Sequence, residues 1–183
     1  MSQLDGQVAL ITGAAHPAGI GYAIARTLLA EGAAVSIVDL RQEACDAAVR
    51  QLSAELSERG QSHVAPLAVA ADVRERDALE RAVQLTVDRF GRLDVLVSNA
   101  GIAQPRKVMD ISPEDWSSTL DVNLRGMLNL TQAALPHLSD GGRIVAIASI
   151  AAQRGGGLLG GPHYAASKGG VLSLAKSMAR EFG

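Results

Sequence analysis

The 183-residue sequence has little of several residue types that mark particular classes of protein. Its one cysteine, Cys45, excludes an internal disulfide framework and fits a reducing compartment. Aromatic residues make up only 3% of the chain, which favours a core of aliphatic side chains. The 17 basic and 19 acidic residues nearly cancel, so the composition indicates no basic surface for nucleic acid or anionic lipid.

Long hydrophobic runs and targeting signals are also missing. The longest stretch without a formal charge, residues 6–25, contains four glycines and a proline, which makes it a poor membrane span. The first six residues have no basic segment typical of a signal peptide. The four histidines have no ligand spacing, so we predict no metal site. These absences favour a cytoplasmic protein with no membrane or nucleic-acid partner.

Short apolar runs alternate with helical periodicities along the chain. Strands are expected at 8–11, 34–38, 64–70, 93–97 and 142–148, and helices at 20–29, 43–58, 77–90, 113–136 and 164–181. Ser112, Pro113 and Asp115 have the spacing of a capping box at the start of the fourth helix. The alternation predicts one α/β domain over residues 1–183, with a Rossmann-type doubly wound parallel sheet of five strands that helices cover on both faces.

A glycine-rich loop, residues 12–21, joins the first strand to its helix. Ligands of such sheets bind at the carboxyl ends of the strands, where this loop lies. Gly13, Gly19 and Gly21 would let the backbone approach a pyrophosphate, and the helix N-terminus offers free N–H groups. The spacing departs from G-x-G-x-x-G, and a turn that only reverses the chain would have the same composition.

Polar residues follow the next three strands. Asp39 ends the second strand, where a carboxylate can bind ribose hydroxyls and repel a 2′-phosphate, which favours NAD over NADP. A helix-capping aspartate is the simpler alternative. Asp72–Val73 and Asn99–Ala100–Gly101 follow the third and fourth strands, where ordinary turn chemistry also explains them.

Tyr164 and Lys168 are spaced i, i+4 and therefore lie on the same face of a helix. A free phenol titrates at about pH 10, and a neighbouring ammonium lowers that pKa by favouring the phenolate. Tyr164 could then exchange a proton with an alcohol or a carbonyl near neutral pH. Ser149, at the end of the fifth strand, could hydrogen-bond the same oxygen. The same Tyr/Lys spacing also occurs by chance on many helices.

In combination, these motifs resemble those of the short-chain dehydrogenase/reductase family, in its single-domain form, over residues 6–183. The resemblance implies that the cofactor is bound by Gly13, Gly19, Ile20, Gly21, Asp39, Asp72, Val73, Asn99, Ala100, Gly101, Tyr164 and Lys168. It implies that catalysis is carried by Ser149, Tyr164, Lys168 and Asn123, the last holding a water in a proton relay. The implied activity is NAD-dependent interconversion of a secondary alcohol and a ketone or aldehyde. In that reaction Lys168 activates Tyr164 as general acid/base and Ser149 orients the substrate oxygen.

The sequence departs from the family pattern at three places. The glycine loop is two residues longer, through His16 and Pro17, and the stretch between Ser149 and Tyr164 is longer by two residues within 155–161. Family members also continue beyond the tyrosine helix, so we expect the C-terminal substrate-binding segment to be absent. A truncated, catalytically inactive dinucleotide-binding module is therefore an alternative, as is another nicotinamide-dependent reaction such as enoyl reduction, epimerisation or dehydration.

The resemblance also implies self-association. Family members form homodimers or homotetramers in which the helices matching 114–136 and 164–181 pack against their copies. Small residues such as Ala165, Ala166, Gly169 and Gly170 permit such close approach of helices, although a tight contact within the chain explains them equally well. The expected partners are a small alcohol or carbonyl substrate and a second copy of the chain.

Overall fold

The structure is a computed structural model that describes residues 3–61, 63–156 and 160–183. The chain is divided into two compact units. The first unit comprises Met1–Ala100 with Asn129–Val145, and the second comprises Gly101–Leu128 with Ala146–Gly183.

The first unit is built on a five-stranded sheet with the order β3-β2-β1-β4-β5. Its strands are β1 (Val8–Thr12), β2 (Ala34–Asp39), β3 (Leu67–Ala70), β4 (Leu93–Ser98) and β5 (Leu138–Ala146). β1 pairs in parallel with β2 and β4, and β2 pairs in parallel with β3. The strand order reverses beside β1, which is where ligands of open α/β sheets bind. The predicted Rossmann-type sheet is confirmed.

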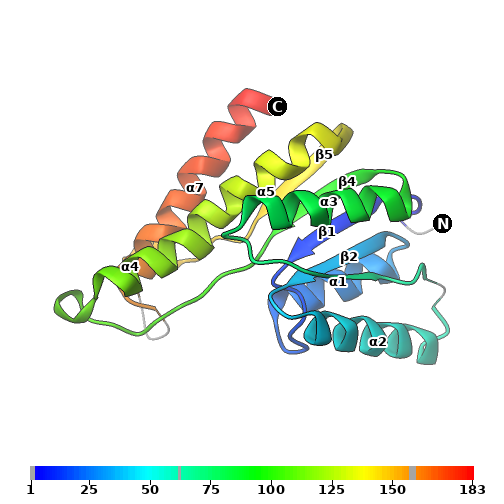
Figure 1. Ribbon diagram of the computed structural model, residues 1–183, viewed down its shortest axis with the longest axis horizontal. Helices are drawn as coiled ribbons and strands as arrows, with labels where there is room; N and C mark the ends of the chain where they lie inside the picture. The colour runs from blue at the N-terminus through cyan, green and yellow to red at the C-terminus, as the bar shows by residue number, and fades with distance from the viewer. Residues whose placement is uncertain (1–2, 62, 157–159) are drawn as a thin grey trace. The chain divides into compact units, whose positions relative to one another are not determined.

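Helices cover both faces of this sheet. They are α1 (Ile20–Ala30), α2 (Gln42–Glu58) and α3 (Arg76–Phe90). Later in the chain, the part of α5 (Gly126–Ala134) from Asn129 onward and the 3₁₀ turn η3 (Leu135–His137) also belong to this unit. α1 and α2 pack side by side on one face, and α3 lies on the opposite face (Figure 1). Consecutive residues of β1 point to opposite faces, and both Leu10 and Ile11 are fully buried because both faces are covered.

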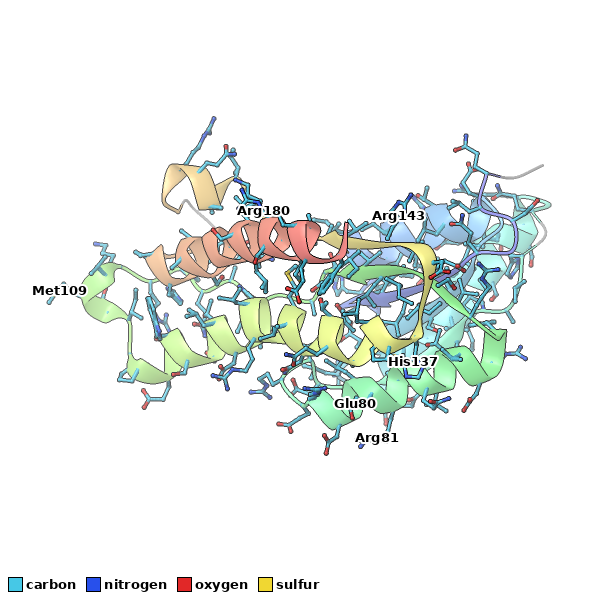
Figure 2. All side chains as sticks on the ribbon, turned by 90° about the horizontal axis from the view of Figure 1, so that it is seen from above. Glu80, Arg81, Met109, His137, Arg143 and Arg180 are labelled. Carbon is cyan, nitrogen blue, oxygen red and sulfur yellow. The ribbon has the colours of Figure 1, made fainter. Side chains whose placement is uncertain are left out.

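A groove of mixed charge lies on the surface between α3 and η3. Figure 2 shows Glu80 and Arg81 of α3 on the side of the unit where His137 lies. The guanidinium of Arg76 forms an ion pair with Glu80 at 2.8 Å and donates a hydrogen bond to Gln132. Because these charges balance one another locally, the groove has no single-sign field that would select a ligand.

The second unit consists of helices. They are the 3₁₀ turn η1 (Val108–Asp110), α4 (Pro113–Leu120), the π-helical turn η2 (Asp121–Arg125), the start of α5, the short α6 (Ala151–Arg154) and α7 (Pro162–Phe182). Met127, Val171 and Met178 form its buried apolar core. The capping box at α4 is present as predicted: Ser112 Oγ accepts the N–H of Asp115 at 3.0 Å, and the Asp115 carboxylate accepts the N–H of Ser112.

Several element boundaries differ from the sequence prediction. The helix expected over 113–136 is divided into α4, η2, α5 and η3, because hydrogen bonding changes at Asp121–Arg125 from the α to the π pattern. The third strand begins at Leu67 instead of residue 64. β5 begins at Leu138 and ends at Ala146, although residues 142–148 were expected. Part of the glycine-rich stretch before α7, residues 157–159, lies outside the described residues.

Within the described ranges, none of the helices combines the length and the apolar character that crossing a membrane requires.

Candidate functional site

The glycine loop of the first unit is a place where the backbone passes very close to its neighbours. Gly13 has a φ of +66°, and a Cβ there would lie 2.7 Å from the Cα of Ala100. A Cβ at Gly21 would lie 2.5 Å from both the carbonyl oxygen of Gly13 and Nδ2 of Asn99. Only glycine fits at these two positions, so the composition of the loop is required by its packing.

Asn99 and Thr12 join the end of β4 to the start of this loop. Asn99 Nδ2 donates to the carbonyl oxygens of Thr12 at 2.9 Å and Gly13 at 2.8 Å. Thr12 Oγ1 accepts the N–H groups of Asn99 and Ala100, each at 3.2 Å. The predicted residues Gly13, Asn99 and Ala100 are thus brought together, and they hold the loop in place by hydrogen bonds within the unit.

The N-terminus of α1 has the features of an anion site. Its N-cap residue, Gly19, supplies no side-chain cap, and the first turn contains no acidic residue. The N–H groups and the positive end of the helix dipole are therefore not neutralised by the chain's own side chains. Ile20, at the first helical position, is 63% exposed, and its contact with a bound cofactor stays a prediction. This cradle fits a pyrophosphate.

Asp39 connects the end of β2 to the glycine loop. Its Oδ2 accepts the N–H of Ala15 at 3.0 Å, and its Oδ1 accepts the N–H of Leu40 at 2.8 Å. These two bonds orient the carboxylate, and each oxygen keeps a second lone pair for another donor. The position therefore combines a structural role with acceptor capacity suited to ribose hydroxyls.

Asp72 and Val73 follow β3 in a turn whose polar groups are already engaged. The Asp72 carboxylate accepts hydrogen bonds from the main-chain N–H and the guanidinium of Arg74, and this hydrogen bonding lowers the pKa of Asp72. The carbonyl oxygen of Val73 accepts Nδ2 of Asn129 at 3.1 Å. Local turn chemistry thus accounts for part of this motif.

Tyr164 and Lys168 lie on α7 of the second unit. Lys168 is 5% exposed, its Nζ donates to the carbonyl oxygen of Ile147 at 2.7 Å, and burial lowers its pKa. The Tyr164 ring packs directly on Gly160, where a Cβ would lie 2.5 Å from the ring carbon Cδ1. Gly160 was not identified from the sequence. The feature that could have identified it is the pair of glycines immediately before α7.

Asn123, Gly101 and Lys168 form a cluster in the second unit. Asn123 lies in the π-helical turn η2, where its Oδ1 accepts the N–H of Ile102 at 2.8 Å. A Cβ at Gly101 would lie 3.2 Å from Asn123 Oδ1 and 3.5 Å from Lys168 Nζ. Ser149 makes a local contact: its Oγ accepts the N–H of Ala151 at the start of α6.

A second residue that the sequence reasoning missed is Ser167, between Tyr164 and Lys168 on α7. It is fully buried and hydrogen-bonded to Asn123. Among the residues that the structure describes, no cluster of three or more His, Cys, Asp or Glu side chains is placed to hold a metal ion.

The chain is similar to short-chain dehydrogenases in sequence and in structure. The family described as short chain dehydrogenase matches residues 7–183. An uncharacterized short-chain type dehydrogenase/reductase of Sinorhizobium fredii is 43% identical over 98% of this chain and 70% of its own length. A 3-oxoacyl-[acyl-carrier-protein] reductase of Thermotoga maritima is 36% identical over 98% of this chain and 69% of its own length. The crystal structure of a short chain dehydrogenase from Burkholderia cenocepacia in complex with NADP has 37% identity and a TM-score of 0.86, covering 99% of this chain and 70% of its own.

Proposed function

We propose, because the chain belongs to the short-chain dehydrogenase/reductase family of oxidoreductases, that it uses NAD to interconvert a secondary alcohol and a ketone or aldehyde. Enzymes of this family bind a nicotinamide dinucleotide. The observation that carries the proposal is the buried ammonium of Lys168 on the same face of α7 as Tyr164, one helical turn away.

The first unit would hold the adenosine and pyrophosphate end of the cofactor. Gly13, Gly19 and Gly21, with the uncapped N-terminus of α1, suit the pyrophosphate, and Asp39 suits the ribose hydroxyls. When bound, the nicotinamide ring supplies or accepts the hydride. Further cofactor contacts are proposed for Ile20, Asp72, Val73, Asn99, Ala100, Gly101, Tyr164 and Lys168.

Tyr164 would be the general acid and base. In the reductive direction its hydroxyl donates a proton to the carbonyl oxygen of the substrate, and in the oxidative direction it removes the proton of the alcohol. The Lys168 ammonium stabilises the phenolate that forms when Tyr164 has given up its proton. Ser149 would hydrogen-bond the substrate oxygen and orient it, and Asn123 would complete the proton relay.

The preference for NAD over NADP is argued from one carboxylate. A relative of known structure binds NADP, so both preferences are compatible with this fold. In this chain Asp39 carries a negative charge at the end of β2, oriented by the N–H groups of Ala15 and Leu40. The charge would repel a 2′-phosphate, whereas the free lone pairs would accept ribose hydroxyls.

The proposal is tested with the purified chain in two steps. NADH and NADPH are titrated while nicotinamide fluorescence is followed, and we expect NADH to bind more tightly. Turnover is then followed at 340 nm with two probes, a 3-oxoacyl thioester in the presence of NADH and a series of small secondary alcohols in the presence of NAD. Binding with turnover of either probe supports the proposal. Tight NADH binding without turnover would favour the inactive binding module, and absence of dinucleotide binding would overturn both.

We also propose that the second unit associates with a second copy of the chain through an apolar groove between η2 and α7. The groove has a volume of about 430 Å³, and its apolar lining is formed by Leu120, Leu124, Leu128, Gly170 and Leu174. Asp121 and Arg125, which form an i, i+4 ion pair, also line it. A contact within the chain accounts for the glycine at position 170, since a Cβ there would lie 2.7 Å from the Leu124 side chain. Gly169, by contrast, has open space beside it.

Introducing a charge into this groove should separate the copies. Leu128→Glu is expected to reduce the molar mass measured by light scattering to that of one chain, because a carboxylate would be buried without a partner in the interface. Leu135→Glu is a matched control, since Leu135 lies outside the groove and is exposed to a similar extent, 37% against 38% for Leu128. A wild-type chain that is already monomeric, or equal masses for all three proteins, would contradict this interface.

A further inference from the structure

Ser167 is a buried hydroxyl to which the proposed reaction assigns no role. It is 0% exposed and precedes Lys168 directly on α7. Its Oγ donates to the main-chain carbonyl oxygen of Tyr164 at 2.7 Å and accepts Nδ2 of Asn123 at 2.9 Å. A serine hydroxyl has a single proton to donate, so the direction of both hydrogen bonds is fixed. Ser167 thus links the helical turn of Tyr164 to Asn123.

Asn123 extends this link to the backbone that follows β4. Its Oδ1 accepts the N–H of Ile102 at 2.8 Å, while its Nδ2 donates to the carbonyl oxygen of Ile102 at 2.9 Å and to Ser167. Both Nδ2 protons are therefore used, and a rotation of the amide by half a turn would set two donors against each other. Because Asn123 is only 3% exposed, water does not replace a lost partner without rearrangement.

The backbone held by Asn123 also lies against the Lys168 ammonium. A Cβ at Gly101 would be 3.2 Å from Asn123 Oδ1 and 3.5 Å from Lys168 Nζ, so the two side chains meet over the same glycine. Lys168 Nζ is fixed on another side by the carbonyl oxygen of Ile147. A displacement of Asn123 would therefore also shift Gly101 and the Lys168 ammonium.

We propose that Ser167 is a positioning residue, which acts through Asn123 and the main chain of Tyr164 to hold the Tyr164–Lys168 pair in its working geometry. The inference rests on the proposed function for the reaction that the pair performs. Without the Ser167 hydroxyl, one Nδ2 proton of Asn123 has lost its buried acceptor, and the amide shifts to find another. Small displacements of reacting groups carry large losses of rate.

We expect Ser167→Ala to lower kcat about 10- to 100-fold while changing the KM for NADH by less than about three-fold. Ser173→Ala is the matched control, because Ser173 is an exposed serine on the same helix, and it should leave kcat unchanged. Ser167→Thr keeps the hydroxyl but adds a methyl group at this fully buried position, so it should retain more of kcat than Ser167→Ala without matching the wild type. If Ser167→Ala does not fold, Ser167→Cys keeps a similar volume with a weaker hydrogen-bonding group and should lower kcat in the same direction.

A double-mutant cycle shows whether Ser167 acts through Asn123. We expect Ser167→Ala to lower kcat much less when Asn123→Ala is already present, because only the bond to the Tyr164 carbonyl oxygen then remains to be lost, whereas independent roles would give additive losses. Additive losses, or an unchanged kcat in folded Ser167→Ala, would overturn the proposal.

A measurement that needs no turnover follows the Ile102 amide proton, which Asn123 protects. Its hydrogen exchange should accelerate in Ser167→Ala and stay unchanged in Ser173→Ala. Unchanged exchange at Ile102 in Ser167→Ala would also overturn the link. If the proposed function fails because Tyr164→Phe keeps full activity, the exchange rate at Ile102 still reports on Ser167 and Asn123, so the two failures are distinguishable.

Discussion

Replacing Tyr164 by phenylalanine is expected to reduce turnover about 10²- to 10⁴-fold and to leave the Kd of NADH within about two-fold. The substitution removes only the hydroxyl, which is the group that exchanges the proton with the substrate oxygen. The ring itself stays, so its packing on Gly160 is kept, as is the main-chain carbonyl that accepts the Ser167 hydroxyl. Stopped turnover with intact NADH binding separates a chemical role of Tyr164 from a structural one.

The chain supplies its own control for this substitution, because it has two tyrosines. Tyr22 lies in the first unit, where its hydroxyl donates to the Glu55 carboxylate at 3.0 Å. Burial, and then the hydrogen bond to Glu55, raises the pKa of Tyr22 to about 12, so it is unsuited to proton transfer. Tyr22→Phe should lower the free energy of unfolding by about 1 kcal/mol and leave turnover unchanged. Equal activity of Tyr164→Phe and the wild type, by contrast, would refute the assignment of the general acid/base.

The order of strands and helices was predictable because each element has its own local signal. The apolar runs of β1 and β2 predict strands that are buried on both faces, and the helical periodicity places α1, α2 and α3 within one residue of their observed starts. Positions where hydrogen bonding between elements decides the geometry were not predictable. Asp140–Gly141–Gly142 is a turn signal, but the structure continues β5 through it, with Gly141 at a φ of +73°.

In the candidate site, too, some features were predictable from the sequence and others were not. Gly13, Gly21 and Asn99 were identifiable because each has a residue type that its backbone contacts demand. The π-helical turn η2 was not, because a hydrogen-bond register that shifts by one residue leaves the apolar pattern of the helix unchanged. Ser167 was overlooked for a related reason. Its partner Asn123 is 44 residues away, and no local pattern indicates a contact over that separation.

Replacing Asp39 by alanine is expected to have the second large effect, which is on the preference for NADH over NADPH. The carboxylate would form charge-assisted hydrogen bonds to ribose hydroxyls, and its loss is expected to weaken NADH binding about 10- to 100-fold. Asp39→Ala also removes the bond to the N–H of Ala15 and so loosens the glycine loop. Loosening the loop weakens NADH and NADPH alike, because both carry the same pyrophosphate. The ratio of the two dissociation constants therefore isolates the interaction with the 2′ position.

We expect the ratio of Kd for NADPH to Kd for NADH to fall at least about ten-fold in Asp39→Ala, measured by nicotinamide fluorescence. Asp72→Ala makes the same change in the turn that follows β3, where the carboxylate is engaged by Arg74, and should leave the ratio unchanged. Part of the wild-type discrimination is repulsion between charges, so the ratio should also shrink at about 0.5 M salt in the wild type but not in Asp39→Ala. A ratio that is the same in the wild type and in Asp39→Ala would mean that the carboxylate only braces the loop through Ala15, and that the preference for NAD must be sought elsewhere.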